Sequence, residues 1–230
     1  MKNIIAFHHY VLYLPLNTYK FLPPGILALL LFVNTLQGQR NCKLQMEKDG
    51  IQVYTCQRDD SGFNAIRASF EVNTTPAQYA SIVLNVDDYQ YWNYAATNPY
   101  VIARISDTEL IYYTEAKAPW PVTDRYVVLH LKVTQDLDSK VMKVTLKNVP
   151  GKIPQQNGFI RMSEYYSTLE IIPIARNKVK ISYFLKIDPG GKIPSWVVNL
   201  VSTKFPINTF SNFKKRVESI GSVYTKDVHN

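Results

Sequence analysis

The sequence predicts an α+β domain, in which a succession of strands is followed by one long C-terminal helix. Most segments after residue 43 alternate apolar and polar residues, as strands with one buried face do. Connectors such as SDTE, DLDS and ARNK are short and polar, so neighbouring strands should pair antiparallel in a long, curving sheet. Helical spacing of apolar residues marks a short helix near residue 80 and a long one after residue 194.

The strands are expected to form one domain over residues 43–220, because this stretch has no internal repeat and no low-complexity linker. The first two, GIQVYTCQ and AIRASFEV, flank the polar turn RDDSG. All of the expected strands read as short alternating runs: 50–57, 65–72, 100–105, 110–116, 125–135, 141–149, 167–174 and 178–187.

The first helix has a recognisable start. Thr74 and Thr75 are good capping residues, and Pro76 suits a first helical position. The apolar residues that follow fit about three turns of one amphipathic helix: Tyr79, Ile82, Val83 and Val86. The aromatic segment DDYQYWNYA after it reads as a turn.

The C-terminal helix is expected to start at Pro194, after Gly190 and Gly191 break the last strand. Pro206 should kink this helix without necessarily ending it. Its large side chains fall at steps of three, four or seven and form one stripe toward the sheet: Trp196, Leu200, Thr203, Ile207, Phe210 and Val217.

The charge pattern argues against a nucleic-acid-binding protein. The formal net charge is +8, but Lys and Arg are scattered singly along strands and turns, and the only tight basic run is residues 214–216. A hydrophobic fraction of 46% is ample for a core. We therefore expect a mildly basic surface that makes transient contact with anionic membranes, and no nucleic-acid partner.

Residues 1–38 look like a leader. The apolar run FLPPGILALLLFV follows Lys20, and Gly38 suits the last residue before a cleavage site. This pattern predicts a signal peptide and an exported protein, periplasmic or secreted. The alternative is that residues 1–38 remain as a membrane anchor, although the run is short for a span of ~20 residues. Cys42 and Cys56 follow directly, and their spacing leaves a disulfide between them open.

Residues that carry catalysis are sparse. His130 is the only histidine in the body of the domain. The alternation of side chains along its strand places it on the side opposite to the apolar residues. No sequence pattern typical of a metal site, a nucleophile elbow or a phosphate loop occurs. The sequence thus gives no positive support to a catalytic residue, a metal or a cofactor.

Three separated motifs resemble those of one family. KAPWPVTDRYVV, with Glu115 on the strand before it, resembles the signature of START domains, the steroidogenic-acute-regulatory-related lipid-transfer family. DPGGKIPSWVVN is similar to the family's entry into its last helix, and VDDYQYWNY to its segment after the first helix. The resemblance covers about residues 43–217, in the short form of bacterial START-like proteins.

The resemblance implies a helix-grip fold, a curved antiparallel sheet wrapped around the C-terminal helix, with a hydrophobic tunnel that holds one lipid. Such binding needs only an apolar lining, worth ~0.8 kcal/mol per buried methylene. It also implies a lipid or other hydrophobic molecule as partner, and we expect a monomer. At Asn93 the sequence departs from some phospholipid-binding members of the family, which carry an acidic residue there for the choline head group.

The family's glutamate and arginine match Glu115 and Arg125, which the resemblance implies form a polar pair in the cavity. Arg125 shares its parity with the apolar residues of its strand, and a buried guanidinium costs several kcal/mol unless it is paired. Tyr112 and Tyr183 also offer hydroxyl groups. The expected cavity residues are Glu115, Arg125, Tyr113, Trp120, Val127, Leu129, Trp196, Leu200, Ile207 and Phe210.

Two alternatives stay open. One is an enzyme similar to polyketide cyclases and aromatases, which would use the same cavity to fold a reactive chain. The other is a lipid sensor, in which residues 1–38 anchor the protein in a membrane and occupancy of the cavity changes its contacts with a partner.

Overall fold

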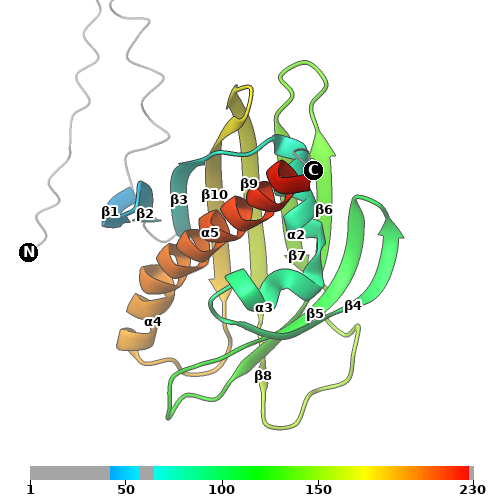
Figure 1. The fold of residues 1–230 in the computed structure, drawn as a ribbon. Helices are drawn as coiled ribbons and strands as arrows, with labels where there is room; N and C mark the ends of the chain where they lie inside the picture. Colours follow the sequence, from blue (N-terminus) through cyan, green and yellow to red (C-terminus); the bar gives the residue numbers. More distant parts are fainter. Residues whose placement is uncertain (1–41, 57–64, 228–230) are drawn as a thin grey trace, which may run out of the picture. The chain divides into compact units, whose positions relative to one another are not determined.

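A large antiparallel sheet organises the chain in the computed structural model, which describes residues 42–56 and 65–227 (Figure 1). The expected leader lies outside the described residues. The sheet has 10 strands: β1 (Cys42–Lys48), β2 (Ile51–Cys56), β3 (Ala65–Val72), β4 (Ala96–Ser106), β5 (Glu109–Ala116), β6 (Arg125–Gln135), β7 (Met142–Asn148), β8 (Ile160–Arg161), β9 (Glu164–Ala175) and β10 (Lys178–Asp188). Their order is β1-β2-β3-β10-β9-β7-β6-β5-β4, and β8 pairs with β6 in parallel.

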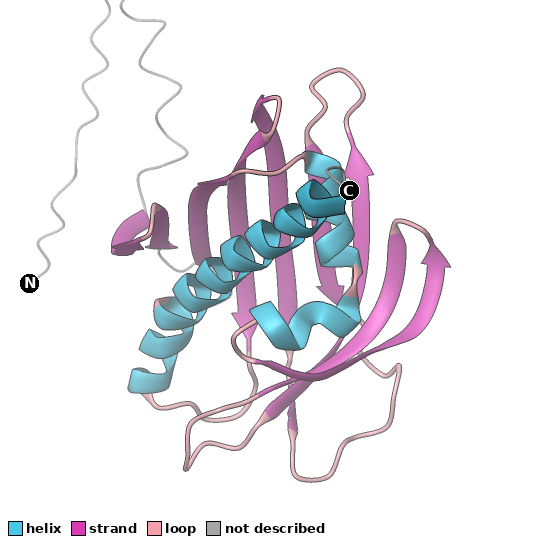
Figure 2. Ribbon diagram, viewed as in Figure 1, coloured by secondary structure: helices cyan, strands magenta, loops and turns pink. Residues whose placement is uncertain are grey.

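Five short or long helical segments complete this part of the chain: α2 (Pro76–Leu84), the 3-10 helix η4 (Val86–Asp88), α3 (Tyr89–Trp92), α4 (Ser195–Ser202) and α5 (Lys204–Asp227). Helix α5 runs across one face of the sheet, with α2 and α3 beside it (Figures 1 and 2). This is the expected α+β helix-grip arrangement, and the fold prediction is confirmed.

Helix α2 begins where the sequence indicates. The Thr75 hydroxyl accepts from the Gln78 amide at 3.2 Å, and the Gln78 side chain accepts from the Thr75 amide at 3.2 Å. This reciprocal capping box satisfies two amides that a helix start otherwise leaves free. Tyr79, Ile82 and Val83 then lie buried against the core.

The C-terminal helix is two helices, and the expectation of one continuous helix is wrong. The backbone leaves helical geometry at Thr203, with φ −126° and ψ −67°, between α4 and α5. Pro206 has no amide hydrogen to donate back to the preceding turn, so it fits the first turn of a new helix better than the middle of an old one.

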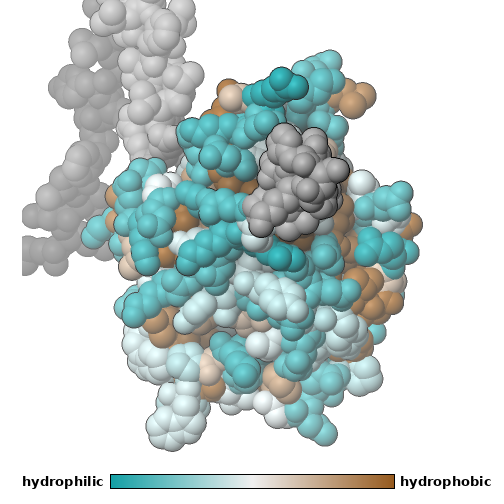
Figure 3. Space-filling view, viewed as in Figure 1, coloured by the Kyte–Doolittle hydropathy of each residue, from teal (hydrophilic) through white to brown (hydrophobic). Residues whose placement is uncertain are grey.

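The buried stripe of α5 consists of Ile207, Phe210, Phe213 and Val217. The Phe210 ring packs 4.7 Å from Phe70 of β3, and the Phe213 ring packs 4.4 Å from Tyr79 of α2. Helix α5 therefore closes the core between the sheet and α2. On the face of the molecule drawn in Figure 3, hydrophilic and hydrophobic residues are interspersed, which agrees with this inward stripe.

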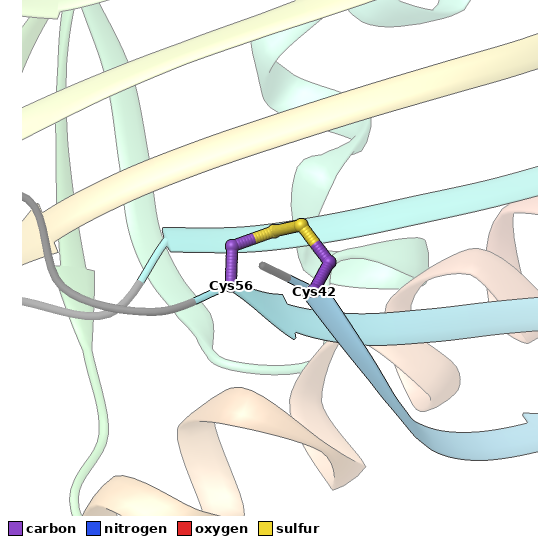
Figure 4. The surroundings of a disulfide bond; sticks show 2 residues. All are labelled: Cys42 and Cys56. Carbon is purple, nitrogen blue, oxygen red and sulfur yellow. A yellow bond between two sulfur atoms is a disulfide. The ribbon is translucent and has the colours of Figure 1, made fainter. Parts of the chain in front are cut away.

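A disulfide joins Cys42 and Cys56, which face each other across β1 and β2 (Figure 4). It ties the first strand, which forms one edge of the sheet, to its only neighbour. The sequence left this bond open, and the structure forms it.

The register of β5 and β6 decides which side chains point inward. Ala116 lies opposite Arg125, and Glu115 lies opposite Tyr126. Residues that face each other in an antiparallel pair share one side of the sheet, and sides alternate along each strand. Arg125 therefore points to the inner side of the sheet, whereas Glu115 points to the outer side.

Candidate functional site

A cavity of about 230 Å³ lies between the inner side of the sheet and helices α2, α3, α4 and α5. Its wall is mostly aliphatic and aromatic. Among the predicted cavity residues, Val127 and Leu129 of β6, Phe210 of α5 and Arg125 line it. Glu115 borders the cavity as well, although its side chain points to the outer side of the sheet. Alternation along β6 places apolar side chains in the wall because the strand is buried on this side.

Asn93, Ala95 and Thr209 are partly exposed wall residues at the end of the cavity where the segments after α3 and β5 meet the start of α5, and we call this end the mouth. The Lys117 amide donates to the Ala95 carbonyl at 3.2 Å, and the Tyr94 amide donates to the Thr209 hydroxyl of α5 at 3.2 Å. The Tyr94 ring also packs 5.4 Å from Phe205. These contacts join the segment after α3, the segment after β5 and the first turns of α5.

Arg125 connects two further segments that border the cavity. The side chain is only 4% exposed, and its guanidinium donates to the backbone carbonyls of Thr123, Pro189 (3.4 Å) and Gly190 (3.2 Å). Burial lowers the pKa of Arg125, and the charge of Asp124 partly offsets this effect. The arginine thus connects the segment before β6 to the loop between β10 and α4.

The expected pair of Glu115 with Arg125 does not form. Glu115 accepts hydrogen bonds from Asn98 Nδ2 at 2.6 Å and from the Tyr113 hydroxyl at 3.0 Å, both on its own side of the sheet. The predicted pair is wrong because the register of β5 and β6 puts the two charges on opposite sides of the sheet. Three backbone carbonyls, not a carboxylate, surround the buried guanidinium.

Several other predicted residues lie outside the cavity wall. Tyr113 is buried on the outer side of the sheet, where its ring stacks 5.9 Å from Tyr126. Trp120 is 90% exposed in the segment between β5 and β6. Trp196 is 45% exposed because Val197 occupies the buried face of α4. Leu200 and Ile207 do not line the cavity either, although Ile207 is buried in the core.

The inner wall carries a group of tyrosines that sequence reasoning found only in part. Tyr89 of α3, Tyr112 of β5, Tyr165 of β9 and Tyr183 of β10 all line the cavity, and we call them the tyrosine cluster. Tyr112 and Tyr183 were expected as hydroxyl donors, whereas Tyr89 and Tyr165 were missed. The inward parity of Tyr112, which it shares with the buried Leu110, is a signal that the sequence offers.

The hydroxyl groups of this cluster interact in two pairs. Tyr89 donates to the Val83 carbonyl at 2.5 Å and interacts with the Tyr112 hydroxyl, and the Tyr165 and Tyr183 hydroxyls interact in the same way. Burial, first of all, raises the pKa of each of the four phenols. Each therefore keeps its proton at neutral pH and serves as a neutral hydrogen-bonding group.

The part of the chain that the structure describes shows no metal-binding group beside the cavity. Among residues 42–56 and 65–227, no group of three or more His, Cys, Asp or Glu residues is placed to hold a metal ion. Nor is any helix in these ranges long and apolar enough to cross a membrane. What the arrangement offers is a shielded apolar space with a few neutral polar groups, which suits non-covalent binding of a hydrophobic molecule.

Comparison with known proteins agrees with this geometry. The chain is 27% identical to the phosphatidylcholine transfer protein of Mus musculus over 162 residues, which is 68% of this chain and 74% of that protein. It is also 27% identical to an uncharacterized protein of Pseudomonas aeruginosa, over 76% of this chain and 86% of that protein.

Solved structures share the fold. A STAR-related lipid transfer protein from Xanthomonas axonopodis superposes with a TM-score of 0.70 at 22% identity, covering 77% of this chain and 99% of the other. The human StAR-related lipid transfer protein 5 gives a TM-score of 0.69 at 18% identity, covering 86% and 94%. The family model of the START domain matches residues 39–221. The resemblance seen in the three sequence motifs is thus confirmed, and the chain belongs to the START domain family.

Proposed function

We propose that this protein binds one hydrophobic molecule in the cavity and carries it between membranes. The observation that carries the proposal is the cavity itself, an apolar space walled by the sheet and four helices with an end where partly exposed residues gather. Membership in a lipid-transfer family and similarity to phosphatidylcholine transfer proteins support lipid as the ligand class.

The mouth also has features that favour contact with a membrane. Trp120 is almost fully exposed, and Trp196 is partly exposed on α4. Lys117 and Lys192 lie exposed in the neighbouring segments. Tryptophan prefers the headgroup region of a bilayer, and lysines near the surface are attracted to anionic lipids. We therefore propose that these side chains touch the bilayer while the ligand enters or leaves.

A displacement assay tests the binding proposal. A fluorescent lipid analogue is bound to the protein and competed with unlabelled sterol, fatty acid and phospholipid. The variant Val201→Trp places a large ring in the wall of the cavity from α4, so affinity should fall roughly tenfold or more, equivalent to about 1.4 kcal/mol. Val198→Trp, on the exposed face of the same helix, is the matched control and should bind normally. No binding of any analogue to the unchanged protein would refute the proposal.

We further propose that the protein is exported after cleavage near Gly38. The disulfide at the edge of the sheet supports this, because such bonds persist in oxidising compartments. Sequencing the mature N-terminus tests it: a chain that begins at Gln39 supports export, and a chain that retains residues 1–38 favours the membrane-anchored sensor. The cyclase-like alternative stays an untested hypothesis.

A further inference from the structure

Polar atoms in the cavity wall carry information about the ligand. Trp92 is only 7% exposed, and its Nε1–H has no hydrogen-bond acceptor. Its ring lines the cavity and packs 4.8 Å from the ring of Tyr89, a member of the tyrosine cluster. Ser167, also in the wall, is buried; its Oγ atom makes no hydrogen bond of regular geometry, but its hydroxyl interacts with those of Tyr165 and Tyr183. Buried polar atoms without partners are costly and rare.

The charged groups of the wall lie away from this cluster or are already satisfied. Among the described residues that line the cavity, Glu115, Lys117 and Arg125 are the only ionisable groups other than tyrosines. Glu115 is engaged by Asn98 and Tyr113, and Arg125 by three carbonyls. Lys117 is exposed at the mouth. The guanidinium of Arg125 keeps its charge, but Arg125 lies opposite Ala116, four residues along β5 from Tyr112 of the tyrosine cluster.

We propose that the ligand is a neutral lipid whose hydroxyl or carbonyl oxygen meets the tyrosine cluster beside Trp92, and that a charged or zwitterionic head group is not accepted there. This inference rests on the proposed lipid-binding function. A hydroxyl or carbonyl oxygen accepts from phenols and from an indole N–H, and the surrounding side chains need not supply a counter-charge. A carboxylate or phosphate at the same place would be buried without a cation.

The size of the cavity points in the same direction. At about 230 Å³ it lies below the ~300–1,000 Å³ that is usual for ligand pockets. The space accommodates one narrow apolar body more readily than the two chains of a phospholipid. A single-chain alcohol or a compact ring alcohol therefore comes closer to this volume than a two-chain phospholipid does.

Matched ligands test the proposal in the full-length protein. Hexadecanol, hexadecanoate and phosphatidylcholine compete with a purely apolar fluorescent probe at about pH 7.5. Hexadecanoate must shed its charge to reach the cluster, and about three pH units separate its pKa from the assay pH. We expect hexadecanol to bind on the order of 10²- to 10³-fold more tightly than hexadecanoate. The preference should shrink as the pH falls toward about 5.

Variants locate the contact. Tyr165→Phe and Tyr183→Phe each remove one hydroxyl group from the wall and should weaken hexadecanol binding roughly 2- to 10-fold while leaving the apolar probe unaffected. Tyr166→Phe is the matched control, because Tyr166 packs against Phe184 and Lys147 and does not line the cavity. Trp92→Phe should weaken hexadecanol binding by a similar factor, since a smaller aromatic ring remains and the N–H donor is lost.

The outcomes separate this inference from the proposed function. Equal or tighter binding of hexadecanoate or phosphatidylcholine at pH 7.5 overturns the inference while it leaves lipid binding in place. So does unchanged hexadecanol affinity in the wall variants. If neither the probe nor any of the three ligands binds the unchanged protein, the proposed function itself fails. The ligand ranking is measured on the unchanged protein, so it decides the question even where a variant does not fold.

Discussion

Replacing Arg125 by methionine tests the role that the structure gives to the buried guanidinium. The substitution keeps much of the side-chain volume and removes the donors to Thr123, Pro189 and Gly190. Hydrogen bonds from a charged donor contribute ~1.5–3 kcal/mol each. Removing a buried charge returns several kcal/mol, so the two effects largely offset each other. We expect the free energy of unfolding to fall by about 2–4 kcal/mol.

Glu115→Ala should cost less than Arg125→Met. Its carboxylate is partly exposed on the outer side of the sheet, and its exposed partner Asn98 regains water when the carboxylate is removed. We expect a loss of about 1 kcal/mol or less. This order is the reverse of what a buried pair of Glu115 with Arg125 requires, because breaking such a pair leaves an uncompensated charge inside.

Urea denaturation gives the free energy of unfolding of each variant, extrapolated to water, and so compares the two losses of stability. Arg176→Met, at the exposed turn between β9 and β10, is the matched control and should leave stability nearly unchanged. If Glu115→Ala costs as much as Arg125→Met or more, the two charges act as a pair and the assignment of Arg125 to the backbone carbonyls is wrong. If Arg125→Met leaves the free energy of unfolding unchanged, the hydrogen bonds of Arg125 to the backbone carbonyls do not stabilise the mouth.

Three further predictions concern other parts of the chain. Arg216→Ala should lower the unfolding free energy by about 2–3 kcal/mol in urea denaturation, because it leaves the Asp88 carboxylate, 2.6 Å away, buried without a cation; a loss near zero contradicts this. Reducing the disulfide between β1 and β2 should cost about 3 kcal/mol, measured as a lower melting temperature; an unchanged melting temperature would show that the bond adds no stability. The pKa of Glu109 lies below 4.5, chiefly because of its hydrogen bond with Lys132 and secondly because of that with His130. The stabilising effect of the Glu109 carboxylate is therefore present above about pH 4.5 and is lost as the pH falls through the lowered pKa. Glu109→Gln should therefore lose less stability than the unchanged protein between about pH 5 and pH 3, and an equal loss in both would refute the assignment.

Much of the sheet can be read from the sequence, because most strands are buried on one side only and alternate accordingly. The strand predicted at residues 125–135 appears with the same bounds as β6. Strand β1 was missed although Cys42, Leu44 and Met46 of its segment CKLQMEK alternate with polar residues; most of the segment is exposed at an edge of the sheet. Strand β8 was missed because two residues carry no pattern.

The candidate site was harder to predict. Parity correctly placed Arg125, Val127 and Leu129 on the inner side, since these residues belong to one strand. The error with Glu115 concerns two strands, and their register depends on the conformation of the intervening segment, which parity does not reveal. In the same way, the break at Thr203 turned α4 and changed which of its side chains face inward.

The central claim is that the cavity holds one hydrophobic molecule. Native mass spectrometry of the purified protein tests it most directly, with Val201→Trp and Val198→Trp measured alongside. We predict that the unchanged protein and the Val198→Trp control carry the mass of one bound lipid, and that Val201→Trp loses it. Ligand-free spectra for the unchanged protein after exposure to sterol, fatty alcohol and phospholipid, or a lipid retained equally in both variants, would contradict the account.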